Sequence, residues 1–183
     1  MTMNEEVVLV DDDGTPIGTA PKASVHGTET ALHLAFSCHV VNEDGDVLVT
    51  RRALDKKTWP GVWTNSFCGH PRPAEPLLHA VHRRAEFELG ITLSEIELAL
   101  PLFRYRATDA SGVVENEICP VYIARTVDDL DLNPREVLEA RWVPPTQLRE
   151  GLAATPWAFS PWLVLQSQQL HLFEPTGLQR MAC

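Results

Sequence analysis

The stretch LHLAFSCHVVNEDGDVLVT, residues 32–50, indicates the fold most directly. Two apolar runs, residues 32–41 and 47–50, flank a polar turn that contains Gly45. Apolar runs on either side of a glycine-bearing turn are typical of a β-hairpin. We therefore expect two neighbouring antiparallel strands here, with the remaining elements arranged around them.

A loop and then a helix are predicted after this hairpin. Residues 53–75 hold several breakers of regular structure, namely Pro60, Gly61, Gly69, Pro71 and Pro73, so this segment should be mostly loop. From Pro76 to Leu89 apolar residues recur at helical spacing (Leu78, Val81, Ala85 and Leu89). Proline in the first turn and Gly90 after the last are ordinary helix boundaries.

The other segments predict an α+β fold. We expect a strand at 7–10, a second long hairpin from 96–106 and 113–124 across the Asp109–Gly112 turn, a strand at 137–143, and helices at 145–153 and 160–173. Strands and helices mix without βαβ alternation, which favours a layered α/β/α arrangement with a mixed sheet flanked by helices. The length of 183 residues predicts a single domain, 1–183, with a core at about 5–170 and a C-terminal tail at 175–183.

The amino-acid composition limits which classes of binding partner and which compartment we expect. The net charge of −10 argues against general binding to nucleic acid or anionic lipid. No apolar run reaches the roughly 18 residues that a membrane span needs. The N-terminus is acidic, whereas an export signal would be basic, and the four cysteines form no CxxC pair. We expect a cytoplasmic monomer with reduced thiols that acts on a small molecule.

Two short segments carry the residues best suited to chemistry. Cys68 lies two positions before His70, which suits a nucleophile or a metal ligand, although a free cysteine is more often a small buried apolar residue. Glu115 and Glu117 fall on one face of a predicted strand, where they either share a cation or are solvated. The apolar residues on both sides favour the cation.

Further candidates lie far apart in the sequence. His26, His33 and His70 with the two glutamates would make a mixed nitrogen and oxygen metal site, whereas His79, His82 and His171 are expected on the surface of helices. Arg51, Arg52, Lys56, Lys57 and Lys22 are either solvated or hold a phosphate. The segment 154–162 contains two tryptophans and a phenylalanine, which predicts core packing or an aromatic cover over a ligand.

Several segments closely resemble the type I isopentenyl diphosphate isomerases, and they stand in the family's order over about residues 5–170. They are residues 50–71, which include Trp59-Pro60-Gly61-Val62-Trp63-Thr64-Asn65-Ser66 and Cys68-Gly69-His70-Pro71, and residues 103–107, 115–121 and 154–162. The resemblance implies an isomerase that converts isopentenyl diphosphate reversibly to dimethylallyl diphosphate, in isoprenoid biosynthesis.

The resemblance also implies roles for single residues. The catalytic pair would be Cys68 and Glu117. One divalent metal, Mn²⁺, Mg²⁺ or Zn²⁺, would bind to His26, His33, His70, Glu115 and Glu117. A Mg²⁺ on the substrate diphosphate would bind to Glu88, near the Cys68 carbonyl. The diphosphate would bind to Lys22, Arg52, Lys56 and Arg84, and the hydrocarbon pocket would include Tyr105 and Trp162.

The family belongs to the Nudix superfamily, and a degenerate Nudix pattern runs from Gly69 to Ile91. Arg84 and Phe87 replace two of the acidic residues that Nudix hydrolases carry. Diphosphate hydrolysis needs several carboxylate-held cations to activate water, so these replacements predict the Nudix scaffold with a different chemistry. A Nudix diphosphohydrolase is the alternative function, and a metal-dependent binding module without catalysis is the third.

Overall fold

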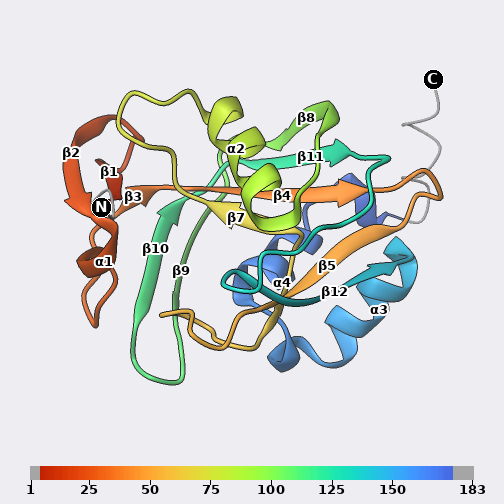
Figure 1. The fold of residues 1–183 in the computed structure, drawn as a ribbon. Helices are drawn as coiled ribbons and strands as arrows, with labels where there is room; N and C mark the ends of the chain where they lie inside the picture. The colour runs from red at the N-terminus through yellow and green to blue at the C-terminus, as the bar shows by residue number, and fades with distance from the viewer. Residues whose placement is uncertain (1–4, 175–183) are drawn as a thin grey trace.

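The computed structural model describes residues 5–174, which form two β-sheets with helices around the second (Figure 1). The first sheet has the order β2-β1-β3-β10-β9, with strands Pro16–Pro21, Glu6–Val10, His33–Leu34, Val114–Ile118 and Arg104–Thr108. The second has the order β12-β5-β4-β11-β8, with strands Val137–Val143, Val47–Arg52, Phe36–Val41, Val121–Arg125 and Ser94–Leu100. Two short strands, β6 (Trp63–Thr64) and β7 (Phe67–Gly69), pair with β5 and β4.

The helices cover both faces of the second sheet (Figure 1). α2 (Leu77–Leu89) lies on one face, and α3 (Pro145–Ala154), α4 (Pro161–Ser167) and the short 3₁₀ turns η1 (Pro156–Ala158) and η2 (His171–Phe173) lie on the other, whereas α1 (Lys22–Val25) lies beside the first sheet. Side chains alternate along a strand. Phe36 and Val40 of β4 therefore pack against α2, whereas Val41 packs on the side of α3 and α4. This confirms the layered α+β prediction.

The first predicted hairpin is confirmed at its turn, where β4 and β5 are antiparallel neighbours, but the two strands separate beyond it. β4 and β5 pair antiparallel only at Val41 and Val47. The segment of β6 and β7 lies between them, and Ser66 joins the two sides: its hydroxyl accepts a hydrogen bond from Val40 N and donates one to Leu48 O, both at 2.7 Å. Part of the predicted loop 53–75 is therefore strand.

The second predicted hairpin is divided between the two sheets. β9 pairs antiparallel with β10 in the first sheet, and β8 pairs antiparallel with β11 in the second. The break falls at Pro101 on one arm and Pro120 on the other. Proline lacks the N–H that a sheet ladder needs, so both arms leave one sheet and enter the other at these positions.

The helix predictions agree with the structure except at the C-terminal end. α2 ends as expected at Gly90, whose φ of 67° is left-handed; a Cβ there would come within 2.6 Å of Asp131. The predicted helix 160–173 is wrong beyond Ser167, where α4 gives way to a turn and η2. The predicted tail 175–183 lies outside the described residues. Between residues 5 and 174, no helix is long and apolar enough to span a membrane.

Candidate active site

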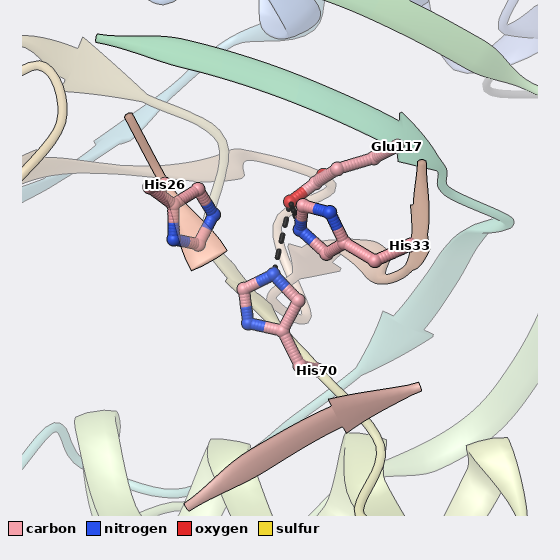
Figure 2. Close-up of side chains that lie close together, drawn as sticks. All are labelled: His26, His33, His70 and Glu117. Carbon is pink, nitrogen blue, oxygen red and sulfur yellow. Dashed lines mark hydrogen bonds and ion pairs between the residues drawn. The ribbon is translucent and has the colours of Figure 1, made fainter. Parts of the chain in front are cut away.

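Three histidines and a glutamate from separate elements converge on one point (Figure 2). His33 on β3 lies opposite Glu117 on β10 in a parallel pair, His26 follows α1, and His70 follows β7. One ligand atom from each of the four lies within 4.8 Å of all the others. The structure thus brings together four of the five residues predicted for the metal site, from positions up to 91 residues apart in the chain (117 − 26).

Glu115, the fifth, lies beside His26. Its Oε2 is 2.8 Å from His26 Nε2, and neither atom has a hydrogen-bond partner among the described residues. Adjacent oxygen or nitrogen ligands of an octahedral Mg²⁺ lie about 3 Å apart, because each is about 2.1 Å from the ion. Glu115 and Glu117 are 6% and 5% exposed, so the solvated hairpin face that the sequence left open is wrong.

The protonation of the histidines suits a cation. His33 donates from Nδ1 to Ala31 O at 2.9 Å, which leaves the lone pair of Nε2 directed at the cluster without a hydrogen-bond partner in the described chain. A second nitrogen fixed by a backbone carbonyl is typical of metal-binding histidines. Burial lowers the pKa of His70 to about 4, so its ring is neutral at pH 7, as metal binding requires.

The carboxylate of Glu117 gives the cluster its negative charge. Burial disfavours its ionised form, but the neighbouring His33 and His70 rings outweigh burial and hold the pKa of Glu117 well below its usual range. Burial by itself would lower the pKa of His33, but the nearby Glu117 carboxylate outweighs burial and raises it. The residues therefore attract positive charge to this point, and the donor set fits a divalent metal ion.

Cys68 and Glu117 line one pocket of about 570 Å³. Cys68 Sγ donates to Asn65 Oδ1 at 3.2 Å and lies 3.3 Å from Ser37 Oγ. Burial raises the pKa of the thiol to about 11, so it carries its proton at neutral pH. Because Cys68 is only partly buried and borders this pocket, the alternative of a wholly buried structural thiol is wrong.

Two aromatic side chains, Tyr105 and Trp162, form another part of the pocket wall. Tyr105 Oη donates to Glu117 Oε2 at 2.9 Å, and its ring lies 5.6 Å from that of Trp162. Trp162 Nε1 donates to Asn65 Oδ1 at 2.9 Å, and the Arg52 guanidinium lies 5.4 Å from the indole ring. The resemblance implied that both aromatic residues border the hydrocarbon pocket, but nothing in the sequence indicated that Trp162 bonds to Asn65, 97 residues away along the chain.

The four residues predicted to bind diphosphate all line the pocket: Lys22, Arg52, Lys56 and Arg84. Lys57 joins them, whereas Arg51 instead pairs with Glu139 at 3.0 Å and does not line the pocket. Most of these cations already have acidic partners. Lys22 pairs with Glu5 at 2.7 Å, and both Lys56 and Arg84 pair with Glu136. Neither Glu5 nor Glu136 was expected from the sequence.

Glu88 lies apart from the four clustered ligands. It is buried on α2, where its Oε1 accepts hydrogen bonds from Arg84 Nε at 2.8 Å and Nη2 at 2.6 Å. Arg84 lines the pocket and therefore connects Glu88 to it. Phe87, the other departure from the Nudix pattern, is 51% exposed, with its ring 5.0 Å from the Arg84 guanidinium.

The remaining sequence candidates lie elsewhere. His79 and His82 are exposed on α2, as predicted, and His171 is half-buried on η2. In the aromatic segment, Trp157 is 82% exposed, so Trp162 is the tryptophan of this segment that borders the pocket.

Comparisons with known proteins identify the family of the chain. A NUDIX domain model matches residues 31–163. A curated relative from Agromyces mediolanus, named Isopentenyl-diphosphate Delta-isomerase, is 68% identical over 91% of this chain and 81% of its own. A second relative of the same name, from Clavibacter sepedonicus, is 66% identical over 91% of this chain and 88% of its own.

Solved structures share the fold at lower identity. A crystal structure from Deinococcus radiodurans has a TM-score of 0.71 at 20% identity, covering 91% of this chain and 99% of its own. A MutT protein from Methanosarcina mazei has a TM-score of 0.59 at 21% identity, covering 83% and 96%. The fold is that of the Nudix proteins, and the close relatives are isomerases. The chain therefore belongs to the type I isopentenyl-diphosphate Delta-isomerase family of the Nudix superfamily.

Proposed function

We propose that this protein interconverts isopentenyl diphosphate and dimethylallyl diphosphate, with Cys68 and Glu117 as the two residues that transfer protons. One observation carries the proposal: a thiol, a carboxylate within a cation-attracting cluster, an aromatic wall and several basic groups border a single pocket. The isomerisation needs all four features.

The reaction adds a proton at the terminal carbon of the alkene and removes another from the methylene bonded to the inner alkene carbon. An unactivated alkene is a weak base, so the site must hold a proton donor close to it and keep water away from the resulting positive charge. Cys68 and Glu117 are assigned the two proton transfers, and the donor and acceptor exchange roles when the reaction runs backwards. The indole face of Trp162 would stabilise the cationic carbon by about 0.5–2 kcal/mol.

Two kinds of metal site are assigned. When bound, a divalent ion at the five-residue site (Mn²⁺, Mg²⁺ or Zn²⁺) would make the acid form of Glu117 a stronger proton donor, and Mg²⁺ near Glu88 would neutralise diphosphate charge. His70 and His33 lie 3.0 and 3.5 Å from one oxygen of the Glu117 carboxylate. Tyr105 holds its other oxygen through the 2.9 Å hydrogen bond.

The basic residues hold the diphosphate and so orient the alkene. Lys22 pairs with Glu5, and Lys56 and Arg84 pair with Glu136. We infer that diphosphate oxygens replace Glu5 and Glu136 as their partners. Binding energy at this remote group positions the reacting carbons. We further infer a cytoplasmic, monomeric enzyme made of one domain that supplies isoprenoid biosynthesis.

The proposal is tested by incubating the purified protein with either C5 diphosphate and measuring conversion to the other. We expect interconversion in both directions, its loss when a chelator removes the metals, and its recovery when Mg²⁺ and Mn²⁺ are returned. Release of inorganic phosphate without isomerisation would instead identify a diphosphohydrolase. Cys68→Ala should abolish turnover, and Cys38→Ala is the matched control, because Cys38 is a buried thiol that packs with the α2 side of the sheet. Turnover of Cys68→Ala at the wild-type rate would overturn the assignment.

A further inference from the structure

A chain of buried polar side chains leads away from Cys68 on the side opposite to the pocket. Ser37 Oγ lies 3.3 Å from Cys68 Sγ, Gln166 Nε2 donates to Ser37 Oγ at 2.9 Å, and His39 Nε2 lies 2.9 Å from Gln166 Oε1. Ser37, Gln166 and His39 are all 0% exposed, and none of them lines the pocket. Buried polar groups cost stability unless they are paired, so a hydrogen-bonded chain of three buried side chains behind a reactive thiol calls for a functional explanation.

The hydrogen bonds in this chain have a defined direction. His39 Nδ1 has no partner among the described residues, and an unpaired lone pair costs less than an unpaired N–H, so we assign the ring proton to Nε2. His39 then donates to Gln166 Oε1, which fixes the amide with its nitrogen toward Ser37. Because Ser37 Oγ accepts from Gln166, its own proton is available for sulfur.

A second thiol completes the bonding of this serine. Cys119 Sγ lies 3.4 Å from Ser37 Oγ, and the Cys119 side chain is buried. A hydroxyl accepts two hydrogen bonds and donates one. With Gln166 and Cys119 as donors, the remaining direction from Ser37 is toward Cys68.

Asn65 holds the other side of the Cys68 sulfur. Its Nδ2 donates to Cys38 O at 3.0 Å and to Phe67 O at 2.7 Å, so the amide cannot turn, and Oδ1 faces the thiol. The same Oδ1 accepts the hydrogen bond from Trp162 Nε1. The sulfur is therefore held between Asn65 and Ser37.

Both supports connect to one helix. Trp162 and Gln166 stand four residues apart on α4, hence on the same face. Trp162 bonds to Asn65, and Gln166 bonds to Ser37. The helix that supplies the aromatic wall thus also determines where the sulfur points.

We propose that Gln166 is a positioning residue that acts through Ser37 to fix the position of the Cys68 sulfur relative to the Trp162 ring. Helix α4 thereby sets the distance between the proton-transfer group and the aromatic wall. The inference rests on the proposed function. Gln166 does not touch the substrate pocket, so its effect should fall on turnover and not on substrate binding.

Gln166→Leu tests this, with Gln168→Leu as the matched control. Gln168 is the residue directly after the last residue of α4. It is exposed, and its side chain makes no hydrogen bond to the described residues. We expect kcat of Gln166→Leu to fall roughly 10- to 100-fold, the scale that a small misplacement of a reacting group costs. KM should stay within about threefold of wild type, because the diphosphate contacts are intact, and Gln168→Leu should match wild type in both constants.

Ser37 supplies the second variant, in case Gln166→Leu folds poorly. Ser37→Ala removes one atom and should reproduce the loss in kcat, whereas Ser37→Thr keeps the hydroxyl and should restore most of it. The double variant Ser37→Ala with Gln166→Leu should be no slower than Ser37→Ala alone, because residues acting through one contact are not additive. Independent structural roles would instead multiply the two losses, and that result would overturn the proposal.

Thiol labelling separates this inference from the proposed function. The rate at which iodoacetamide labels Cys68, followed by peptide mass spectrometry at one pH, should change about 3- to 10-fold in Gln166→Leu, as expected for loss of a hydrogen bond. The rate in Gln168→Leu should not change. Absence of isomerase activity in the wild type would refute the proposed function, whereas an unchanged labelling rate in Gln166→Leu would refute only the positioning role.

Discussion

Thr58→Val should weaken metal binding at the five-residue site. Thr58 is 4% exposed, and its hydroxyl donates to Glu115 Oε1 at 2.7 Å. That bond leaves Oε2 of the same carboxylate directed at His26. Valine has nearly the shape of threonine, so the substitution removes the hydroxyl and leaves the packing in place. Arg52 keeps its hydrogen bonds to the Thr58 carbonyl, at 3.1 and 2.9 Å, and loses only the one that it donates to the hydroxyl, at 3.2 Å.

The magnitude follows from the kind of hydrogen bond that is lost. A bond to a charged group contributes about 1.5–3 kcal/mol, and about 1.4 kcal/mol corresponds to a tenfold change in affinity. The affinity for the metal should therefore fall about 10- to 100-fold, which is also the usual effect of removing a partner that orients a metal ligand.

Titration of metal-free protein with Mn²⁺ by calorimetry measures this affinity directly. Thr58→Ser is the control, because it keeps the hydroxyl and should bind within about threefold of wild type, well inside the loss of a hydrogen bond. Melting curves of the metal-free proteins should coincide, which would show that the fold is intact. Equal Mn²⁺ affinity in Thr58→Val and wild type would refute the view that Thr58 orients Glu115 for a metal.

Two further predictions concern Tyr105 and Glu136. Tyr105→Phe keeps the aromatic wall but removes the hydrogen bond to Glu117 Oε2, so kcat should fall about tenfold or more at unchanged KM; equal kcat values would show that this bond does not matter for turnover. The charges of Arg84 and Lys56 outweigh burial and lower the pKa of Glu136 below its ordinary value of 4.5. Its carboxylate thus stabilises the fold above pH 4.5 and loses this effect as the pH falls through the lowered pKa. Urea unfolding between pH 7 and pH 3.5 should show a shallower acid loss of stability in Glu136→Gln than in wild type, and parallel curves would contradict the assignment.

Local sequence patterns were sufficient for several elements. Helical spacing with Pro76 and Gly90 at its ends predicted α2 closely, and the Asp109–Gly112 turn closes as expected, with Gly112 N bonded to Asp109 O. These features depend on neighbouring residues only, since caps, turns and hydrophobic periodicity act over a few positions. The candidate ligands were also recognisable, because few residue types bind metals.

Tertiary structure alone decided which strands pair and how the site is assembled. The predicted hairpin of β4 and β5 pairs only next to its turn, and beyond that pair Ser66 joins the strands from a segment that had been expected to be loop. His33 meets Glu117 because β3 and β10 pair in parallel across 84 residues (117 − 33), and Gln166 reaches Ser37 across 129. Such contacts form only when distant apolar faces are buried together, and a short window of sequence carries no information about which faces those are.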